Sequence, residues 1–394
     1  MKYSSLIERV SGSSADVWDS HYNAIAAKKR GEDVIVLSVG DPDFNTPVAI
    51  IDAATRAMHA GDTHYTSIKG NTELRDCIAT RHQQSSGQQV TADNIIITSG
   101  AQNALFGITQ CIVEAGDEVI VLQPMYVTYE ATIQATQARL VPVVLDVESG
   151  FSLDAEKLKE AITDKTRAIY YASPSNPTGI TLKPDELQAI ADLAIEHDLW
   201  VVADEVYSDF VFDNEFHHIS SLPGMTERTV TVGSMSKSYA MTGWRVGWAI
   251  APVQLIDNLE RLALCMLYGL PGFIQQAALH ALKHCDEDMR SMRDIYRQRR
   301  DLLFNAFTSM PGLNALKPDA GMFIMLDVRG TGLTAPQFVT QLYDFAKVSV
   351  LDATAFGASA EGFVRVSYTS GEDVLKEAIT RIGNFSQQLQ ASSQ

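Results

Sequence analysis

The chain has 394 residues, which is long enough for two or three domains and a large hydrophobic core. Apolar residues make up 46% of the sequence and charged residues 20%, as in ordinary globular proteins. The formal net charge of −17 argues against nucleic acid and anionic membrane surfaces as partners.

The start of the chain and the cysteines point to the same kind of protein. Residues 1–18 lack the continuous apolar core of a signal peptide, and no stretch approaches the ~18 apolar residues of a membrane helix. The cysteines form no CxxC pair and show no metal-type spacing. We therefore expect a soluble, cytoplasmic protein without a metal site.

Short apolar runs alternate with longer amphipathic segments through the middle of the chain. The apolar runs are continuous, which is typical of parallel strands buried on both faces. Leu187, Ile190 and Ala194 share one face of an expected helix, and Pro184 suits its first turn. In chain order the sequence predicts a strand at 94–100, a helix at 101–115, a strand at 117–124, a helix at 128–137, a strand at 166–174, a helix at 184–198, and strands at 199–207, 229–234 and 246–252.

The pattern changes near residue 290. The elements expected there are a charged amphipathic helix at 292–307 and strands at 322–328, 348–356 and 362–369. The predicted fold is α/β, with a three-layer α/β/α large domain around a mostly parallel sheet and a smaller α+β domain built from both chain ends. The expected boundaries are 1–45 for an N-terminal segment joining the small domain, 46–288 for the large domain, where the ligand site of an open sheet would lie, and 289–394 for the small C-terminal domain.

Polar groups follow several predicted strands, at the position where open α/β sheets bind ligands. "SGAQ" (99–102) leads into a helix, so its backbone N–H groups could hold an anion, although a simple tight turn is the alternative. "SPSNPTG" (173–179) is either a structural turn or a polar site around Asn176. Asp204, with Tyr207 close behind it, is either a helix cap or a functional carboxylate.

Lys237 lies among small and hydroxyl residues in "SMSKSYAMTGWRVGW". Ser234 and Ser236 can donate hydrogen bonds, and Arg245 can bind a phosphate through two N–H groups. An amine that can form a Schiff base beside a phosphate site is the pattern of a pyridoxal phosphate enzyme. Asp204 would then pair with the pyridinium nitrogen of that cofactor.

In these motifs the sequence resembles the class I aminotransferases, which are pyridoxal-phosphate enzymes of fold type I. The lysine segment fits the signature of that family, including the arginine that follows. The resemblance runs nearly from end to end and includes "SVGDPDF", "HYTSIKGNTELR", "SGAQ", "QPMYVTYE", "SNPTG", "ADEVY", "PDAGMF" and "FVRVSY". It implies a transaminase that moves an α-amino group from an L-amino acid to a 2-oxo acid by a ping-pong mechanism, with pyridoxal 5'-phosphate as cofactor.

The resemblance also implies the catalytic roles. Lys237 would form the Schiff base and, once released, carry the proton between the substrate Cα and the cofactor. Asp204 would keep the ring nitrogen protonated, so that the ring can accept the electron pair. Arg365 would bind the substrate α-carboxylate through a planar two-point contact, helped by the backbone of Gly40 and by Asn176.

The remaining matched residues would bind the cofactor. Tyr207 and Asn176 would hydrogen-bond the ring hydroxyl, and Tyr126 would stack on the ring. Tyr65 would reach the phosphate from a second subunit, so a homodimer with shared active sites is expected. The other phosphate ligands would be the backbone of Ala101 and Gln102 and the side chains of Ser234, Ser236 and Arg245.

Two features bear on the amino donor. Bacterial aspartate aminotransferases of this pattern carry a lysine for the distal carboxylate where this chain has Gln102, and an amide compensates a carboxylate poorly. "WDSHY", "PMYVTYEA" and "LALCMLYG" are most similar to the arginine–pyruvate transaminases of bacterial arginine catabolism, which implies L-arginine as donor and pyruvate as acceptor. Trp18 would belong to the substrate pocket. Asp19 beside it is either the acidic group that a guanidinium needs or an ordinary surface aspartate.

Other functions stay open at this point. An aspartate-type or aromatic-type aminotransferase would keep the same lysine, and so would a carbon–sulfur β-lyase of the same fold. An aminotransferase-like regulator would need an attached DNA-binding domain, for which the short N-terminal segment and the acidic charge leave no room. A nicotinamide dehydrogenase would need a GxGxxG turn after its first strand, which the sequence lacks.

Overall fold

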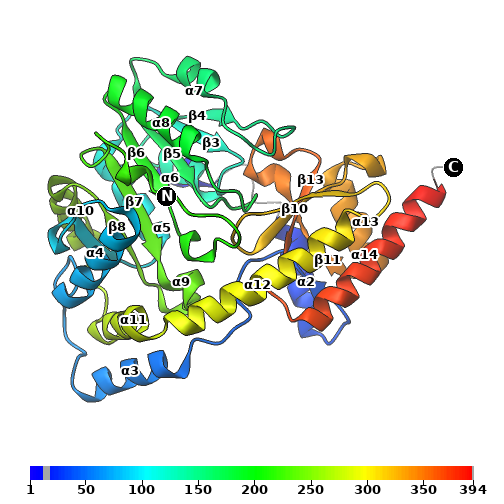
Figure 1. The fold of residues 1–394 in the computed structure, drawn as a ribbon, viewed down its shortest axis with the longest axis horizontal. Helices are drawn as coiled ribbons and strands as arrows, with labels where there is room; N and C mark the ends of the chain where they lie inside the picture. Colours follow the sequence, from blue (N-terminus) through cyan, green and yellow to red (C-terminus); the bar gives the residue numbers. More distant parts are fainter. Residues whose placement is uncertain (12–17, 393–394) are drawn as a thin grey trace.

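The computed structural model describes residues 1–11 and 18–392, and within them a seven-stranded sheet forms the centre of the larger part (Figure 1). The sheet is parallel except for β8, which runs antiparallel to both neighbours. This is the mostly parallel sheet that the continuous apolar runs predict. In spatial order its strands are β2 (Ile95–Thr98), β8 (Gly247–Ile250), β7 (Thr229–Ser234), β6 (Trp200–Asp204), β5 (Thr166–Ala172), β3 (Glu118–Gln123) and β4 (Arg139–Val144).

Both faces of this sheet are covered by helices. Successive side chains of a strand point to opposite faces, so each strand packs against helices on both sides of the sheet. Ile169 of β5 packs in one buried cluster with Leu158 and Leu187. Its neighbour Tyr170 packs in a second cluster with Leu105. The helices on the first face are α7 (Ala155–Ala161) and α8 (Pro184–Glu196), and those on the second are α5 (Ala101–Ile112), α6 (Thr128–Gln134) and α10 (Val253–Met266).

A smaller part is built from both ends of the chain, as the sequence predicts. It holds a four-stranded antiparallel sheet of β12 (Leu351–Asp352), β13 (Phe363–Ser367), β10 (Phe323–Asp327) and β9 (Asn314–Leu316). β1 (Ile35–Val36) pairs with β11 (Val348–Ser349), which ties the N-terminal segment to the C-terminal region. The helices of this part are α2 (Asp19–Lys29), α13 (Ala335–Ala346) and α14 (Glu372–Ser392).

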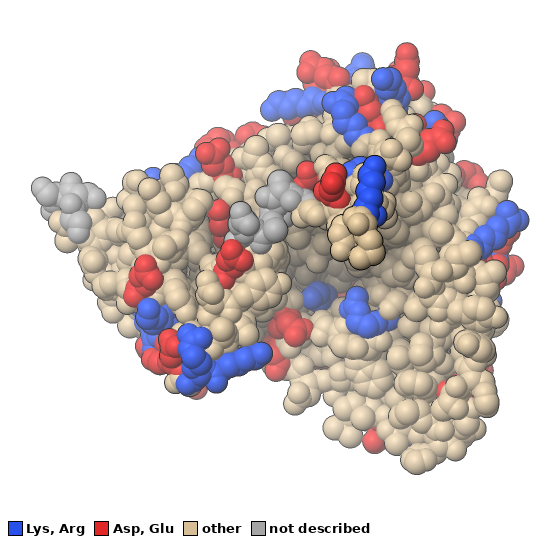
Figure 2. Space-filling view, turned by 180° about the vertical axis from the view of Figure 1, so that it is seen from behind, with Lys and Arg blue, Asp and Glu red and all other residues tan. Residues whose placement is uncertain are grey.

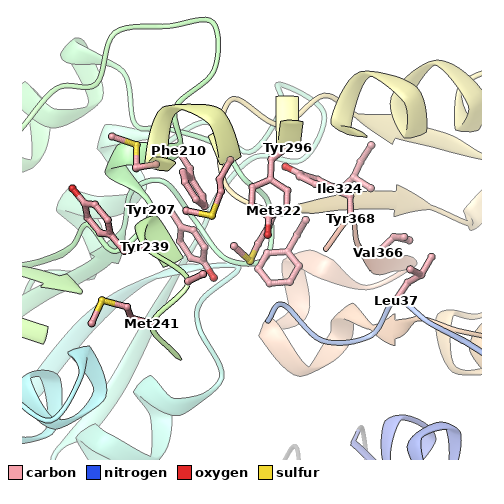
Figure 3. Close-up of a cluster of buried hydrophobic side chains, with 14 of the residues drawn as sticks. Leu37, Tyr207, Phe210, Tyr239, Met241, Tyr296, Met322, Ile324, Val366 and Tyr368 are labelled. Carbon is pink, nitrogen blue, oxygen red and sulfur yellow. The ribbon is translucent and has the colours of Figure 1, made fainter. Parts of the chain in front are cut away.

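One buried cluster joins the two parts. Tyr207 and Phe210, which follow β6, lie beside Tyr296 of the long helix α12 (Asp286–Phe307), and the small-sheet residues Ile324 and Val366 continue the same cluster (Figure 3). The two sheets are therefore held together by a continuous apolar core. The other helices are α1 (Ser5–Val10), α3 (Val48–His59), α4 (Thr72–Ser86), α9 (Met235–Ser238) and α11 (Gly272–His284).

The sequence prediction is incomplete, and β4 and α12 show two ways in which the structure differs from it. β4 has no counterpart among them, because it is an edge strand with Pro142 and only one fully buried residue, Val143. α12 begins at Asp286 rather than at 292, and its acidic first turn suits a helix N-terminus. Within the described residues, no helix is long and apolar enough to cross a membrane.

Candidate active site

A cavity of about 510 Å³ lies where the two parts meet, at the carboxyl ends of the parallel strands. From the other side of the molecule, the surface is hollowed there and Lys or Arg atoms lie in the hollow (Figure 2). All the predicted site residues except Tyr65 line this cavity. They are Trp18, Gly40, Ala101, Gln102, Tyr126, Asn176, Asp204, Tyr207, Ser234, Ser236, Lys237, Arg245 and Arg365.

One end of the cavity is formed by the turn at Gly100, at the N-terminus of a helix. The chain passes from β2 into α5 through Gly100, which has a φ of 79°, so the first N–H groups of α5 point outward. A Cβ at Gly100 would lie 2.6 Å from Nη2 of Arg245, so only glycine lets the guanidinium approach this turn. Ser234 caps the short helix α9, accepting a hydrogen bond from the N–H of Ser236 at 3.1 Å.

Lys237 lies near the end of α9, and its amine donates a hydrogen bond to the carbonyl of Gly40 at 2.7 Å. Burial lowers the pKa of this amine to about 8, with Arg365 and Arg245 adding to the effect and Asp41 opposing it. An amine with such a pKa is partly neutral near pH 7. Such an amine is chemically suited to act as a nucleophile, the role that the resemblance implies for Lys237.

Asp204 ends β6 and is buried. Tyr129, which was not among the predicted site residues, donates a hydrogen bond to Oδ2 of Asp204 at 2.7 Å. Burial raises the pKa of Asp204 to about 6, and the hydrogen bond from Tyr129 opposes that rise. A buried carboxylate of this kind gains from a cationic partner in the cavity.

Arg365 lies in the middle of β13 with 2% of its surface exposed. It donates to Oδ1 of Asn176 and to the carbonyl of Ser38, both at 2.8 Å, and its guanidinium lies 4.1 Å from the ring centre of Phe323. In the described part of the chain it forms no ion pair, and its Nε has no hydrogen-bond partner. Burial lowers its pKa to about 10, as expected for a buried cation that lacks an anion.

Residues 32–382 match the family model described as aminotransferase class I and II. The chain belongs to this family. It is 49% identical to arginine–pyruvate transaminase of Pseudomonas aeruginosa, over 97% of each chain. It is 35% identical to an aspartate aminotransferase of Pyrococcus horikoshii, over 89% of this chain and 90% of that one. Its fold matches the aspartate aminotransferase of Thermus thermophilus solved with maleate, with a TM-score of 0.92 and 32% identity over 98% and 99% of the two chains.

The family and the fold establish the aminotransferase activity and confirm the α/β fold of type I that the sequence predicts. The roles of the single residues in this aminotransferase stay predictions. Tyr65 lies outside the cavity of its own chain, 88% exposed, and its ring lies 4.8 Å from that of Tyr268. A contact of Tyr65 with a neighbouring subunit's cofactor therefore stays a prediction too.

An acidic residue other than Asp19 lies in the cavity wall. Of the two alternatives for Asp19, the structure agrees with the ordinary surface aspartate, because Asp19 is exposed and does not line the cavity. Asp41 lines it instead and accepts a hydrogen bond from Thr242 at 2.8 Å. Asp41 belongs to the motif "SVGDPDF", so the sequence contained evidence that it lies near the site. No local pattern, however, showed which of the two aspartates lines the cavity.

Gln102 is held in the wall by helix α6. Its Oε1 accepts from Thr128 at 2.6 Å, and its Nε2 donates to Thr132 at 3.2 Å. The two threonines satisfy one lone pair and one N–H of the amide, and they fix its orientation. In this aminotransferase the side chain at this position is therefore neutral and restrained.

Proposed function

We propose that this aminotransferase binds pyridoxal 5'-phosphate in the cavity and moves the α-amino group of an L-amino acid to a 2-oxo acid. The observation that carries the proposal is that four groups line one cavity. They are the amine of Lys237, whose pKa is lowered, the buried carboxylate of Asp204, and the guanidinium groups of Arg245 and Arg365. The membership in class I and II aminotransferases supports the same cofactor.

The residues present fit this cofactor. The turn at Gly100 and Arg245 offers N–H donors to a phosphate, as helix N-termini and guanidinium groups do. Asp204 offers a buried carboxylate to a protonated ring nitrogen. Within the described residues, Arg365 has a buried Nε without a hydrogen-bond partner and forms no ion pair. An anionic ligand in the cavity would supply the missing partner.

The cofactor would supply a conjugated ring that takes up the electron pair left when the Cα–H bond breaks. The chain's own residues would do the rest. Arg365 orients the substrate by its α-carboxylate, which fixes the direction of the Cα–H bond. Lys237 holds and moves the proton, since its pKa of about 8 allows both protonation states near neutral pH. Tyr126 and Tyr207 line the same cavity, where Tyr126 would stack on the ring and Tyr207 would hydrogen-bond its hydroxyl.

L-arginine is the amino donor that we propose, with pyruvate as the acceptor and arginine catabolism as the setting. The 49% identity to a protein named arginine–pyruvate transaminase supports this donor. Gln102 supports it too, because a dicarboxylic donor would find a neutral amide there. Asp41 puts a carboxylate in the cavity wall that suits a guanidinium.

An aspartate-type or aromatic-type aminotransferase is the second candidate. The 35% identity to an aspartate aminotransferase supports it less strongly. A carbon–sulfur β-lyase would use the same lysine and the same cavity. These alternatives differ in which substrate is consumed and which product appears.

We also propose a cytoplasmic homodimer in which Tyr65 reaches the partner's cofactor phosphate. Exposed apolar side chains around the end of α10, including the Tyr268 that Tyr65 contacts, support a second chain on this face, because exposed apolar surface marks interaction sites. They are Leu264, Met266, Leu267 and Tyr268. The domain boundaries 1–45, 46–288 and 289–394 stay part of the proposal.

The test is the visible spectrum of the protein with pyridoxal phosphate, before and after single amino acids are added. Loss of the visible cofactor band with L-arginine but not with L-aspartate, together with L-alanine formed from pyruvate, would support the mechanism and the donor. Loss with aspartate or aromatic donors would remove arginine and keep the transaminase. Pyruvate released from cystathionine would favour the lyase, and a missing band would contradict the role of Lys237.

A further inference from the structure

Helix α2 has little apolar attachment to the rest of the molecule. Its only buried residues are Ala24 and Ala27, which pack with Val34 in a small cluster. It lies against β1 and β11 at the small part of the molecule (Figure 1). Such a helix is positioned by specific polar contacts rather than by a large buried surface.

One polar contact of α2 leads to Arg365, one of the two arginines that line the cavity. Nδ1 of His21 lies 2.8 Å from Oγ of Ser38, which is fully buried. The carbonyl of the same serine accepts the hydrogen bond from Nη2 of Arg365 at 2.8 Å. Ser38 therefore holds α2 with its hydroxyl and the guanidinium with its carbonyl.

A second serine restrains the same contact. Ser349 donates its hydroxyl proton to Oγ of Ser38 at 3.1 Å, so the hydroxyl of Ser38 is held by both Ser349 and His21. Burial, helped by the charge of Arg365, lowers the pKa of His21, which favours the neutral imidazole. Nδ1 of a neutral imidazole accepts from Ser38 in one tautomer and donates to it in the other, so either tautomer joins the two residues.

The imidazole also contacts the wall of the cavity. Trp18 lines the cavity, and its ring meets that of His21 edge to face at 5.9 Å. His21 thus touches both a cavity wall and the serine that holds Arg365. The segment "WDSHY" contains this histidine, but the resemblance implies no role for it.

We propose that His21 is a positioning residue for the substrate α-carboxylate, because it fixes Ser38 beneath Arg365 and Trp18 beside the same cavity. This inference rests on the proposed function, in which Arg365 binds that carboxylate. His21 does not touch the reacting atoms. Its loss therefore weakens substrate binding more than it slows the chemistry.

Two substitutions separate the hydrogen bond from the ring. His21→Phe keeps an aromatic edge for Trp18 but cannot form a hydrogen bond with Ser38, whereas the amide of His21→Asn can accept from Ser38 or donate to it. We expect the KM for the amino donor to rise roughly three- to tenfold in His21→Phe, the effect of one lost hydrogen bond, with kcat changed by less than about twofold. His21→Asn should recover most of the KM. His197→Phe, on an exposed histidine after α8, is the control and should leave both constants unchanged.

A second measurement does not depend on turnover. Pyruvate carries the carboxylate but no amino group, and its binding to the protein loaded with pyridoxal phosphate can be followed by tryptophan fluorescence, with Trp18→Phe to assign the signal. Weaker pyruvate binding in His21→Phe but not in His21→Asn supports the inference. It does so even if the protein transfers no amino group, because a lack of transfer would reject only the proposed function. Equal pyruvate affinity in the wild type and His21→Phe, or equal losses in both variants, would overturn the role of His21.

Discussion

The amine of Lys237 and the carbonyl of Gly40 are joined by a hydrogen bond of 2.7 Å across 197 positions of the chain. Lys237 follows a strand of the large sheet, whereas Gly40 follows the N-terminal strand β1 that pairs with β11. A Cβ at Gly40 would lie 2.0 Å from the ring of Phe323, so only glycine allows this approach. The environment of the amine therefore depends on the docking of the two parts of the molecule.

Removal of this amine should abolish amino-group transfer. We expect Lys237→Ala to lose at least about a thousandfold in kcat, within the range of a lost general base plus lost attachment of the cofactor. The measurement is the formation of the 2-oxo acid from L-arginine. Lys376→Ala removes an exposed lysine paired with Glu372 and should behave as the wild type. Appreciable turnover in Lys237→Ala would contradict the assignment.

The pH dependence of cofactor capture reports the pKa of Lys237. The neutral amine is the reactive form, and burial lowers its pKa to about 8. We expect the rate at which the cofactor-free protein captures pyridoxal phosphate to rise with pH and to level off above about 8. Asp41 favours the charged amine, so Asp41→Asn should move the plateau to lower pH. Stopped-flow absorbance measures the rate, and a rate still rising past about pH 10, near the ordinary lysine pKa, would argue against a lowered pKa.

A charge at position 102 should change the donor preference. Gln102→Lys places an ammonium group in the cavity wall beside Thr128, where a distal carboxylate would pair with it. We expect the ratio of kcat/KM for L-aspartate over L-arginine to rise by about tenfold or more. Gln102→Met has a similar length without charge or hydrogen bonds. If Gln102→Met raises the ratio as much as Gln102→Lys, charge is not the cause.

Loss of the Tyr65 hydroxyl tests the shared site. If Tyr65 donates to the phosphate of a partner's cofactor, Tyr65→Phe loses a hydrogen bond to a charged group, about 1.5–3 kcal/mol. We expect the dissociation constant of pyridoxal phosphate to rise roughly tenfold or more, measured by equilibrium absorbance titration. Tyr3→Phe, on another tyrosine with 84% of its surface exposed, should have no effect. A protein that is monomeric by light scattering would contradict the shared site directly.

The close contact between β8 and the turn before α5 should make Gly247 intolerant of a side chain. A Cβ there would lie 2.6 Å from the backbone N of Ala101 and 2.9 Å from the carbonyl oxygen of Gly233. We expect Gly247→Ala to lower the free energy of unfolding by about 1–3 kcal/mol and to weaken phosphate binding. Denaturant titration measures the first effect and cofactor affinity the second. Gly371→Ala, which meets no atom within 4 Å, is the control, and an equal stability of the two variants would show that the turn can shift.

Most elements of the large sheet could be predicted because their signals are local. The buried runs ending at Asp204 and Ser234 are continuous and apolar, and the helix at 184–196 has its apolar residues on one face and Pro184 in its first turn. β4 could not be predicted, since an edge strand that is half exposed and contains Pro142 has no distinctive local pattern.

Local patterns are enough to show which residue types are available for chemistry and where the strands that carry them end. Lys237, Arg245 and the turn before α5 could be predicted because each lies within a short segment. The packing of distant segments is what brings Arg365 to Asn176, 189 positions away, places Asp41 rather than Asp19 in the cavity wall, and brings His21 to Ser38. The physical reason is that propensity and periodicity act over a few residues, whereas the neighbours of a side chain in the cavity are set by how distant segments pack.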